Sequence, residues 1–223
     1  EWLCATLSHE SKKKQSAGEV SNTFKALVNP RILVLALVYF GTSAGLYTLG
    51  IWSPQLLNEF ALSTEQIGLI NAVPPIFAVI AMVIWGRHSD KTEERPWHVF
   101  FACIVASMGL FIASFAQSLL AVVISLIIVN IGVSSAKAPL WAMPSQFLSG
   151  RGAAAGIAAI NSIGNLGGFF GPTFIGYIKS TTGGYQWGLI GVAISLAISA
   201  CLVITINSPS QKRTIKTPTV IAK

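Results

Sequence analysis

Charged residues are scarce in this chain, and none of its acidic residues lies inside a long apolar stretch. Only 10% of the 223 residues are charged, whereas roughly one quarter are charged in a soluble globular domain. With 52% hydrophobic residues and a mean hydropathy of +0.65, the composition excludes an ordinary soluble domain and predicts a protein that crosses a membrane several times. The acidic residues are Glu1, Glu10, Glu19, Glu59, Glu65, Asp90, Glu93 and Glu94.

Metal-binding and catalytic patterns are also missing. The three cysteines, Cys4, Cys103 and Cys201, are too scattered for a metal cluster, and the three histidines, His9, His88 and His98, are all expected at the cytoplasmic side. His88, Ser89 and Asp90 are adjacent in the sequence, but a catalytic triad needs residues that meet in space. We weigh a six-span intramembrane enzyme as an alternative, and we expect no enzyme activity, no metal and no cofactor.

Six apolar stretches approach the length of about 20 residues that crosses the hydrocarbon core of a bilayer. They cover residues 31–56, 67–86, 97–116, 119–144, 152–178 and 185–206. The expected fold class is an all-α membrane protein in which residues 31–206 form one bundle of six transmembrane helices. Residues 1–30 are expected to be a basic cytoplasmic arm or linker, and residues 207–223 a basic cytoplasmic tail.

Lysine and arginine collect on one side of these stretches. Of the 15 basic residues, only Lys179 lies in a connection on the other side, and only Lys137 lies within a stretch and away from its ends. Cytoplasmic loops are enriched in Lys and Arg, so both ends of the bundle are predicted to be cytoplasmic. The net charge of +7 is therefore explained by basic residues on the predicted cytoplasmic side of a membrane protein, and no nucleic-acid partner is expected.

Lys137 is the only charge that lies inside an apolar stretch and away from its ends. A cation in hydrocarbon costs about 2.5–3.5 kcal/mol on insertion scales, so it marks a candidate functional site. At about 100° per residue, it shares one helix face with Asn130, Ser134 and Trp141. Because no acid in the apolar stretches can pair with it, the counter-charge is either a substrate or another part of a larger protein. The alternative is a side chain that snorkels to the cytoplasmic interface.

Two other stretches carry polar side chains at helical spacing. Tyr39, Ser43 and Tyr47 recur every four residues in the first stretch, before glycines and a proline that weaken a helix. In the fifth stretch, Asn161 and Asn165 lie one turn apart, beside glycines at the small-xxx-small spacing that lets helices approach closely. These residues either line a substrate cavity or contribute only to helix packing.

The connection "GRHSDKTEERPWH" at residues 86–98 is rich in charge. It resembles the signature loop between the second and third helices of a six-helix half in the major facilitator superfamily, with Glu93 in place of the second glycine of the usual pattern. It would form a charge-paired hinge between two moving spans, or else an ordinary charged loop. The candidate gating residues are Gly86, Arg87, Asp90, Lys91 and Arg95.

Two further segments, "APLWAMPSQFLSG" and "AAAGIAAINSIGNLGGFFGPTFIGYIK", sharpen the resemblance. With the loop, they are similar to the C-terminal half of the bacterial anion:cation symporter family, whose members carry tartrate-, phthalate- or sugar-acid-type carboxylates. The resemblance implies a twelve-helix inner-membrane transporter that works by alternating access. It also implies substrate contacts from Tyr47, from the region of Lys137 and Trp141, and from Asn161 or Asn165.

Partners follow from the same resemblance. It implies a small carboxylate substrate, a coupling proton and an N-terminal six-helix half that supplies the coupling carboxylate. Because the first residues, "EWLCATLSHE", look like the tail of an amphipathic helix, we expect the chain to be part of a longer protein. The alternative function is a six-span non-transporting binding or assembly subunit, or an inactive fragment.

Overall fold

The computed structural model describes residues 27–206, and its long elements are all helices. They are α3 (Pro30–Asn58), α4 (Thr64–Thr92), α5 (Arg95–Phe115), α6 (Leu119–Ala142), α7 (Gly150–Thr182) and α8 (Gln186–Ile204), with the short 3-10 helix η1 (Pro144–Gln146) after α6. Each of the six long helices is apolar and long enough to cross a membrane. The predicted six-helix membrane bundle is thereby confirmed. The predicted tail, and all but the last four residues of the predicted arm, lie outside the described residues.

Helix starts follow from local side-chain chemistry. The Asn29 side chain accepts a hydrogen bond from the backbone N–H of Arg31 at 2.9 Å, directly before Pro30 opens α3. Ser63 and Gln66 form a reciprocal capping box at the start of α4. Such caps satisfy backbone N–H groups that have no partner within the helix. All predicted helix ends but one agree with the structure to within four residues.

The exception is the end of α4, where the expected loop is helical. Residues 87–92 contain no glycine or proline that would stop the helix, and α4 therefore continues to Thr92. The backbone reverses only at Glu93, which has the left-handed φ of 57° and donates its N–H to the Ser89 carbonyl. The candidate gating residues Gly86, Arg87, Asp90 and Lys91 thus lie on a helix, and Arg95 opens α5.

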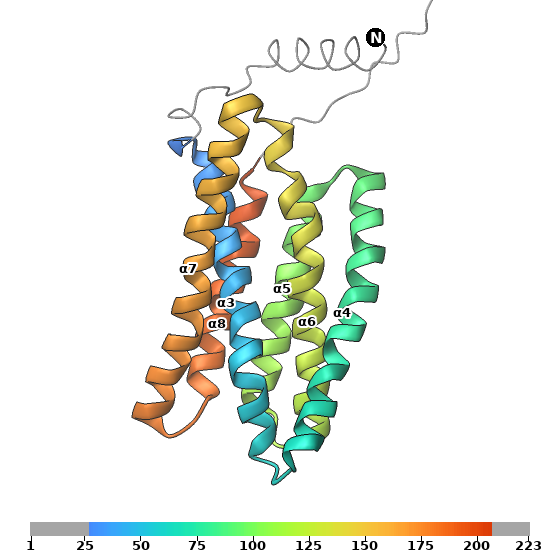
Figure 1. Cartoon of the computed structure of the whole chain (residues 1–223), viewed down its shortest axis with the longest axis vertical. Coiled ribbons are helices and arrows are strands. Elements are labelled where there is room, and N and C mark those ends of the chain that lie inside the picture. Colours follow the sequence, from blue (N-terminus) through green and yellow to red (C-terminus); the bar gives the residue numbers. More distant parts are fainter. Residues whose placement is uncertain (1–26, 207–223) are drawn as a thin grey trace, which may run out of the picture.

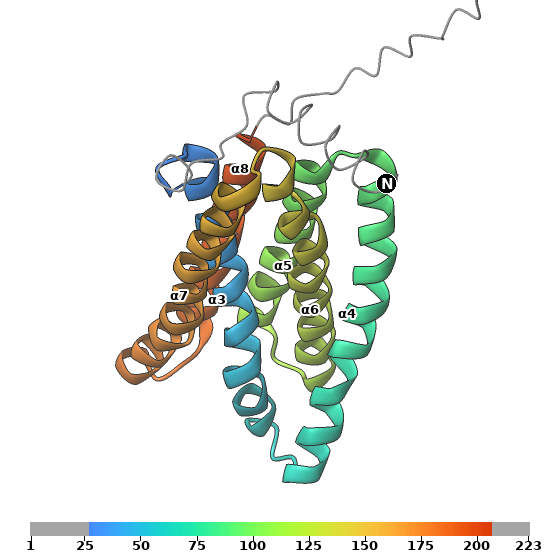
Figure 2. The ribbon, with the colours of Figure 1, turned by 45° about the horizontal axis from the view of Figure 1, so that its top comes forward.

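Two helices lie at the edges of the bundle. Figures 1 and 2 show α4 along one edge and α7 along the opposite edge, with α3 and α6 between them. In its most apolar window, 61% of α3 is buried, compared with 11% of α4 and 22% of α7. Helices α4 and α7 therefore keep most of their surface free for lipid or for another part of the protein.

Glycines bring α7 close to α3. A Cβ atom on Gly167 would lie 2.0 Å from the Phe40 carbonyl oxygen, and one on Gly171 would lie 2.9 Å from the Ala44 Cα atom. Small residues permit such contact between helix backbones in membranes. Since Gly156 lies against Ile32 at one end of the contact, α3 and α7 run in parallel.

Candidate functional site

Tyr39 is the centre of the candidate site, because it contacts residues of both neighbouring helices. Its ring meets the Trp141 ring of α6 edge-on, with 4.9 Å between centroids. On its other side it packs against Gly164 of α7, where a Cβ atom would clash with the ring. The structure thus brings together, at one level of the bundle, residues that lie far apart in the sequence.

Lys137 lies one helical turn deeper into the bundle than Trp141. Its side chain is half-buried, and among residues 27–206 its ammonium has no hydrogen-bond or ion-pair partner. Gly86 of α4 faces the adjacent Ala138, and α4 ends six residues beyond Gly86, about 9 Å along the helix axis. Lys137 therefore carries an unbalanced charge in the half of the bundle where α4 ends.

The polar stripe predicted on α6 forms one partly exposed helix face. Asn130, Ser134, Lys137 and Trp141 are all half-buried, whereas most residues between them are buried. Asn130 donates its side-chain N–H to the Leu126 carbonyl at 3.0 Å, so its carboxamide oxygen has no partner within the described bundle. The exposed edge of the stripe therefore combines a cation with hydrogen-bonding groups.

On α7, the two asparagines are exposed and bond to each other. The side-chain N–H of Asn165 donates to the side-chain oxygen of Asn161 at 2.9 Å. Neither makes a side-chain hydrogen bond to another helix in the part of the chain described here, so within this bundle they do not act as interhelical hydrogen bonds. Because Gly164 contacts Tyr39, Asn165 lies at the level of the Tyr39–Trp141 pair.

The remaining α3 candidates differ in exposure. The Tyr47 side chain is 46% exposed and packs on Gly168, whereas Ser43 is only 2% exposed. In this conformation Tyr47 presents a hydroxyl at the surface and Ser43 presents none.

Arg95 joins three helix ends at the candidate gate. It donates a hydrogen bond of 2.8 Å to the Ala142 carbonyl at the end of α6, and it lies 3.5 Å from the Asp90 carboxylate near the end of α4. Asp90 is 72% exposed, so this ion pair is screened by solvent and contributes little by itself. The stronger link is the charged hydrogen bond to α6.

A pair of histidines beside the candidate gate was not predicted from the sequence. His88 and His98 approach to 2.7 Å between Nδ1 and Nε2, and the buried His98 ring is held by the Glu94 carbonyl at 2.8 Å. The Trp85 indole donates to the His98 carbonyl. His88 and His98 lie equally far from Glu93 along the sequence, on either side of it. A tight turn at Glu93 therefore brings the two rings together. In residues 27–206, no three metal-ligating side chains cluster.

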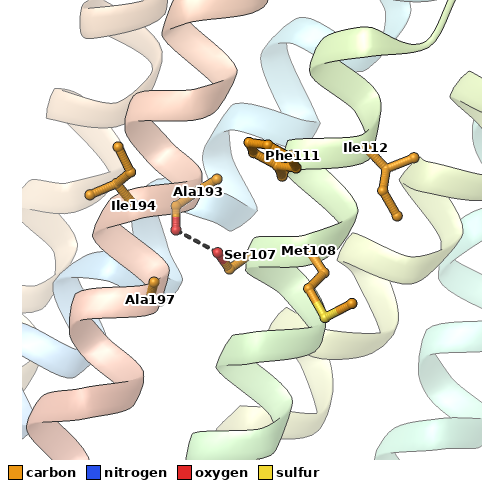
Figure 3. A pocket seen from close by; sticks show the side chains of 7 residues that line it. All are labelled: Ser107, Met108, Phe111, Ile112, Ala193, Ile194 and Ala197. Atoms are coloured by element: carbon orange, nitrogen blue, oxygen red, sulfur yellow. Dashed lines mark hydrogen bonds between the residues drawn. The ribbon is translucent and has the colours of Figure 1, made fainter.

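Figure 3 shows a separate groove between α5 and α8. It encloses about 240 Å³ and is lined mainly by apolar side chains, with Ser107 donating a hydrogen bond to the Ala193 carbonyl at 2.7 Å. Since that hydroxyl is already engaged, the groove offers an anion no free hydrogen-bond donor. It is not part of the site around Tyr39.

Six apolar helices with a partly exposed cationic stripe define a polytopic membrane protein. Residues 3–172 match the family model of the Major Facilitator Superfamily, and the chain belongs to this family. The family expected from the charged connection and the helix pattern is thereby confirmed.

Relatives with curated names support the same assignment. Two proteins of Agrobacterium vitis, each named "Putative tartrate transporter", are 57% and 55% identical over 92% and 95% of this chain. A "Quinolone resistance transporter" of Acinetobacter baumannii is 33% identical over 90% of it. These alignments cover 47%, 46% and 46% of the relatives, so the chain spans about half the length of the curated relatives it matches.

Proposed function

We propose that this chain is the C-terminal half of a secondary active transporter for a small organic anion, such as a dicarboxylate or a sugar acid. The substrate class is suggested by the tartrate-transporter relatives. The observation that carries the proposal is the Lys137 ammonium, which has no anionic partner within the described bundle. A substrate carboxylate would supply the missing charge.

The site would use three helices. Lys137 would pair with a carboxylate, while Asn130, Ser134 and Trp141 would shape the α6 wall of the pocket. On α3 and α7, the side chains at the same height in the bundle as Trp141 are Tyr39 and the Asn161–Asn165 pair. Tyr47 lies farther along α3. These groups can donate hydrogen bonds to carboxylate and hydroxyl oxygens, as a hydroxy acid requires.

Transport would proceed by alternating access in the bacterial inner membrane. The partner would be an N-terminal six-helix half, and α4 and α7 offer it their uncovered surfaces. Intramembrane carboxylates commonly carry the coupling proton in such transporters, but none of the acidic residues of this chain lies deep within a described helix. The proton would therefore bind the other half, with both ends of the present bundle on the cytoplasmic side.

The test is uptake by the complete protein reconstituted in liposomes. Lys137→Ala should abolish tartrate uptake while membrane abundance stays unchanged, and Lys137→Arg should retain part of it because the cation is kept. Counterflow with a panel of carboxylic acids would identify the substrate. Unchanged uptake by Lys137→Ala would contradict the proposal and favour a lysine that snorkels to the interface.

Proton coupling is tested separately in the same liposomes. An inward proton gradient should accelerate uptake, and a protonophore should remove the acceleration. If the reconstituted protein binds carboxylates but never moves them across the bilayer, the non-transporting alternative holds.

A further inference from the structure

A second lysine is held at the opposite end of the bundle from the Arg95 gate. Lys179 lies in the last turn of α7, where the chain turns toward α8 at the lower end in Figure 1. Its ammonium donates a hydrogen bond to the Tyr185 hydroxyl, and it lies 4.1 Å from the centroid of the Tyr185 ring and 5.7 Å from that of the Trp52 ring. The Tyr185 hydroxyl in turn donates to the side-chain oxygen of Gln55 at 3.3 Å.

This lysine is turned toward the bundle rather than toward the membrane surface. Lysine near a helix end usually extends its ammonium into the interface, often among aromatic residues. Here the ammonium instead contacts Tyr185, whose side chain is only 6% exposed. The Trp52 indole is fixed by a hydrogen bond of 3.1 Å to the Pro172 carbonyl of α7. The two rings therefore cover the ammonium on the side that faces the bundle.

The unused side-chain groups of Lys179 and Gln55 are hydrogen-bond donors. An ammonium has three N–H groups, and one of those of Lys179 is engaged with a described residue. The Gln55 oxygen accepts from Tyr185, which leaves the two N–H groups of its carboxamide free toward solvent. The ion pair found within residues 27–206 joins Arg95 and Asp90, far from this cluster. The Lys179 ammonium is half-buried, its neighbours are neutral, and it keeps unused N–H donors. It therefore suits an anion such as a carboxylate, which only accepts hydrogen bonds.

We propose that Lys179, Gln55 and Trp52 form a second binding site for a carboxylate, at the extracytoplasmic mouth of the transporter. The cluster lies 14 residues beyond Asn165 along α7, about 21 Å along the helix axis, so a small dicarboxylate cannot occupy both sites at once. The ligand class and the side of the membrane rest on the proposed function. The site would hold the arriving anion before it reaches Lys137.

The site is tested by direct binding to the complete protein in phosphatidylcholine nanodiscs. The Lys137→Ala variant removes the proposed central site, and sodium tartrate is titrated while tryptophan fluorescence is recorded. A saturable change is expected because Trp52 lies beside the bound anion, and Trp52→Phe should remove most of the signal. Sodium chloride at constant tartrate should weaken binding through screening.

The decisive variant adds Lys179→Gln to Lys137→Ala. It should abolish the saturable change, whereas Lys179→Arg, which keeps the cation, should retain it. Gln55→Leu alters an exposed side chain and should weaken tartrate binding about tenfold through loss of one hydrogen bond to the anion. This variant decides the question if Lys179→Gln does not fold.

Two results would overturn the second site. One is tartrate binding in the Lys137→Ala background that persists after both Lys179→Gln and Gln55→Leu. The other is a folded Lys137→Ala variant that shows no fluorescence change, as expected if a lipid phosphate of the nanodisc already occupies the cluster. Neither result affects the proposed function, which depends on whether Lys137→Ala abolishes uptake. Conversely, if uptake by Lys137→Ala is unchanged, the loss of the Trp52 signal in Lys179→Gln still tests the second site.

Discussion

Substituting Gly167 by alanine tests the contact between α3 and α7. The added Cβ atom would lie 2.0 Å from the carbonyl oxygen of Phe40 and 2.8 Å from its carbonyl carbon. Ordinary carbon–oxygen contacts are longer than 3 Å, so the two backbones must separate by more than 1 Å. Both atoms belong to a helix backbone, and no rotation of a flexible side chain can relieve the overlap.

The expected cost follows from two opposing terms. Overpacking a closely packed contact costs typically 1–3 kcal/mol, whereas alanine in place of glycine stabilises a helix by about 0.5–1 kcal/mol. The steric term is the larger because the whole α3–α7 contact is built on glycines. With roughly 2–4 °C per kcal/mol for a protein of about this size, Gly167→Ala should lower the unfolding temperature by several degrees.

Gly68→Ala is the matched control, because it adds the same methyl group within α4 at a position where no atom of another described helix lies within 4 Å. Only the helix-propensity term then remains, and the unfolding temperature should stay the same or rise slightly. Both variants of the complete protein are measured in detergent, by following monodispersity on a size-exclusion column after heating. If Gly167→Ala is as stable as Gly68→Ala, the close approach of α3 to α7 is wrong.

Two predictions concern the turn between α4 and α5. Glu93→Gly should stabilise the protein by about 1 kcal/mol, because a left-handed backbone is costly for any residue with a Cβ atom, and an unchanged or lower unfolding temperature would contradict the left-handed turn. Arg95→Lys should destabilise the protein more than Asp90→Asn does, since it removes the hydrogen bond to Ala142, worth about 1.5–3 kcal/mol, whereas the exposed ion pair is worth at most about 1 kcal/mol. Equal unfolding temperatures of these two variants would show that the link to α6 is not formed.

The six helices of the bundle could be predicted because a membrane requires a minimum length and a high hydrophobicity of each span. Both properties can be read directly from the sequence. The same signal failed at the end of α4. Residues 87–92 are polar, and hydropathy therefore ends the span at Gly86, but nothing in them breaks a helix. A helix can leave the hydrocarbon and continue in water, so the end of an apolar stretch does not fix the end of a helix.

For the candidate site, the sequence predicted which residues share a face of one helix, but not which helices contact one another. Helical periodicity placed Asn130, Ser134, Lys137 and Trp141 on one face, and all four are half-buried on that face. Periodicity carries no information on which helices meet, so the contact of Trp141 with Tyr39 came only from the structure. The environment of Lys179 was hidden for the same reason. In the sequence it is one charge in a connection, and the rings that hold it come from other helices.

The glycine at position 164 links helix packing to the candidate site. Helices α6 and α7 make little contact with each other, and α3 packs against both. At this level the Tyr39 ring therefore fills the space between α6 and α7, in contact with Trp141 and Gly164. A side chain at position 164 would displace this ring without removing any polar group. The glycines of α7 thus have two roles, because they let α3 approach and they leave room for the Tyr39 ring.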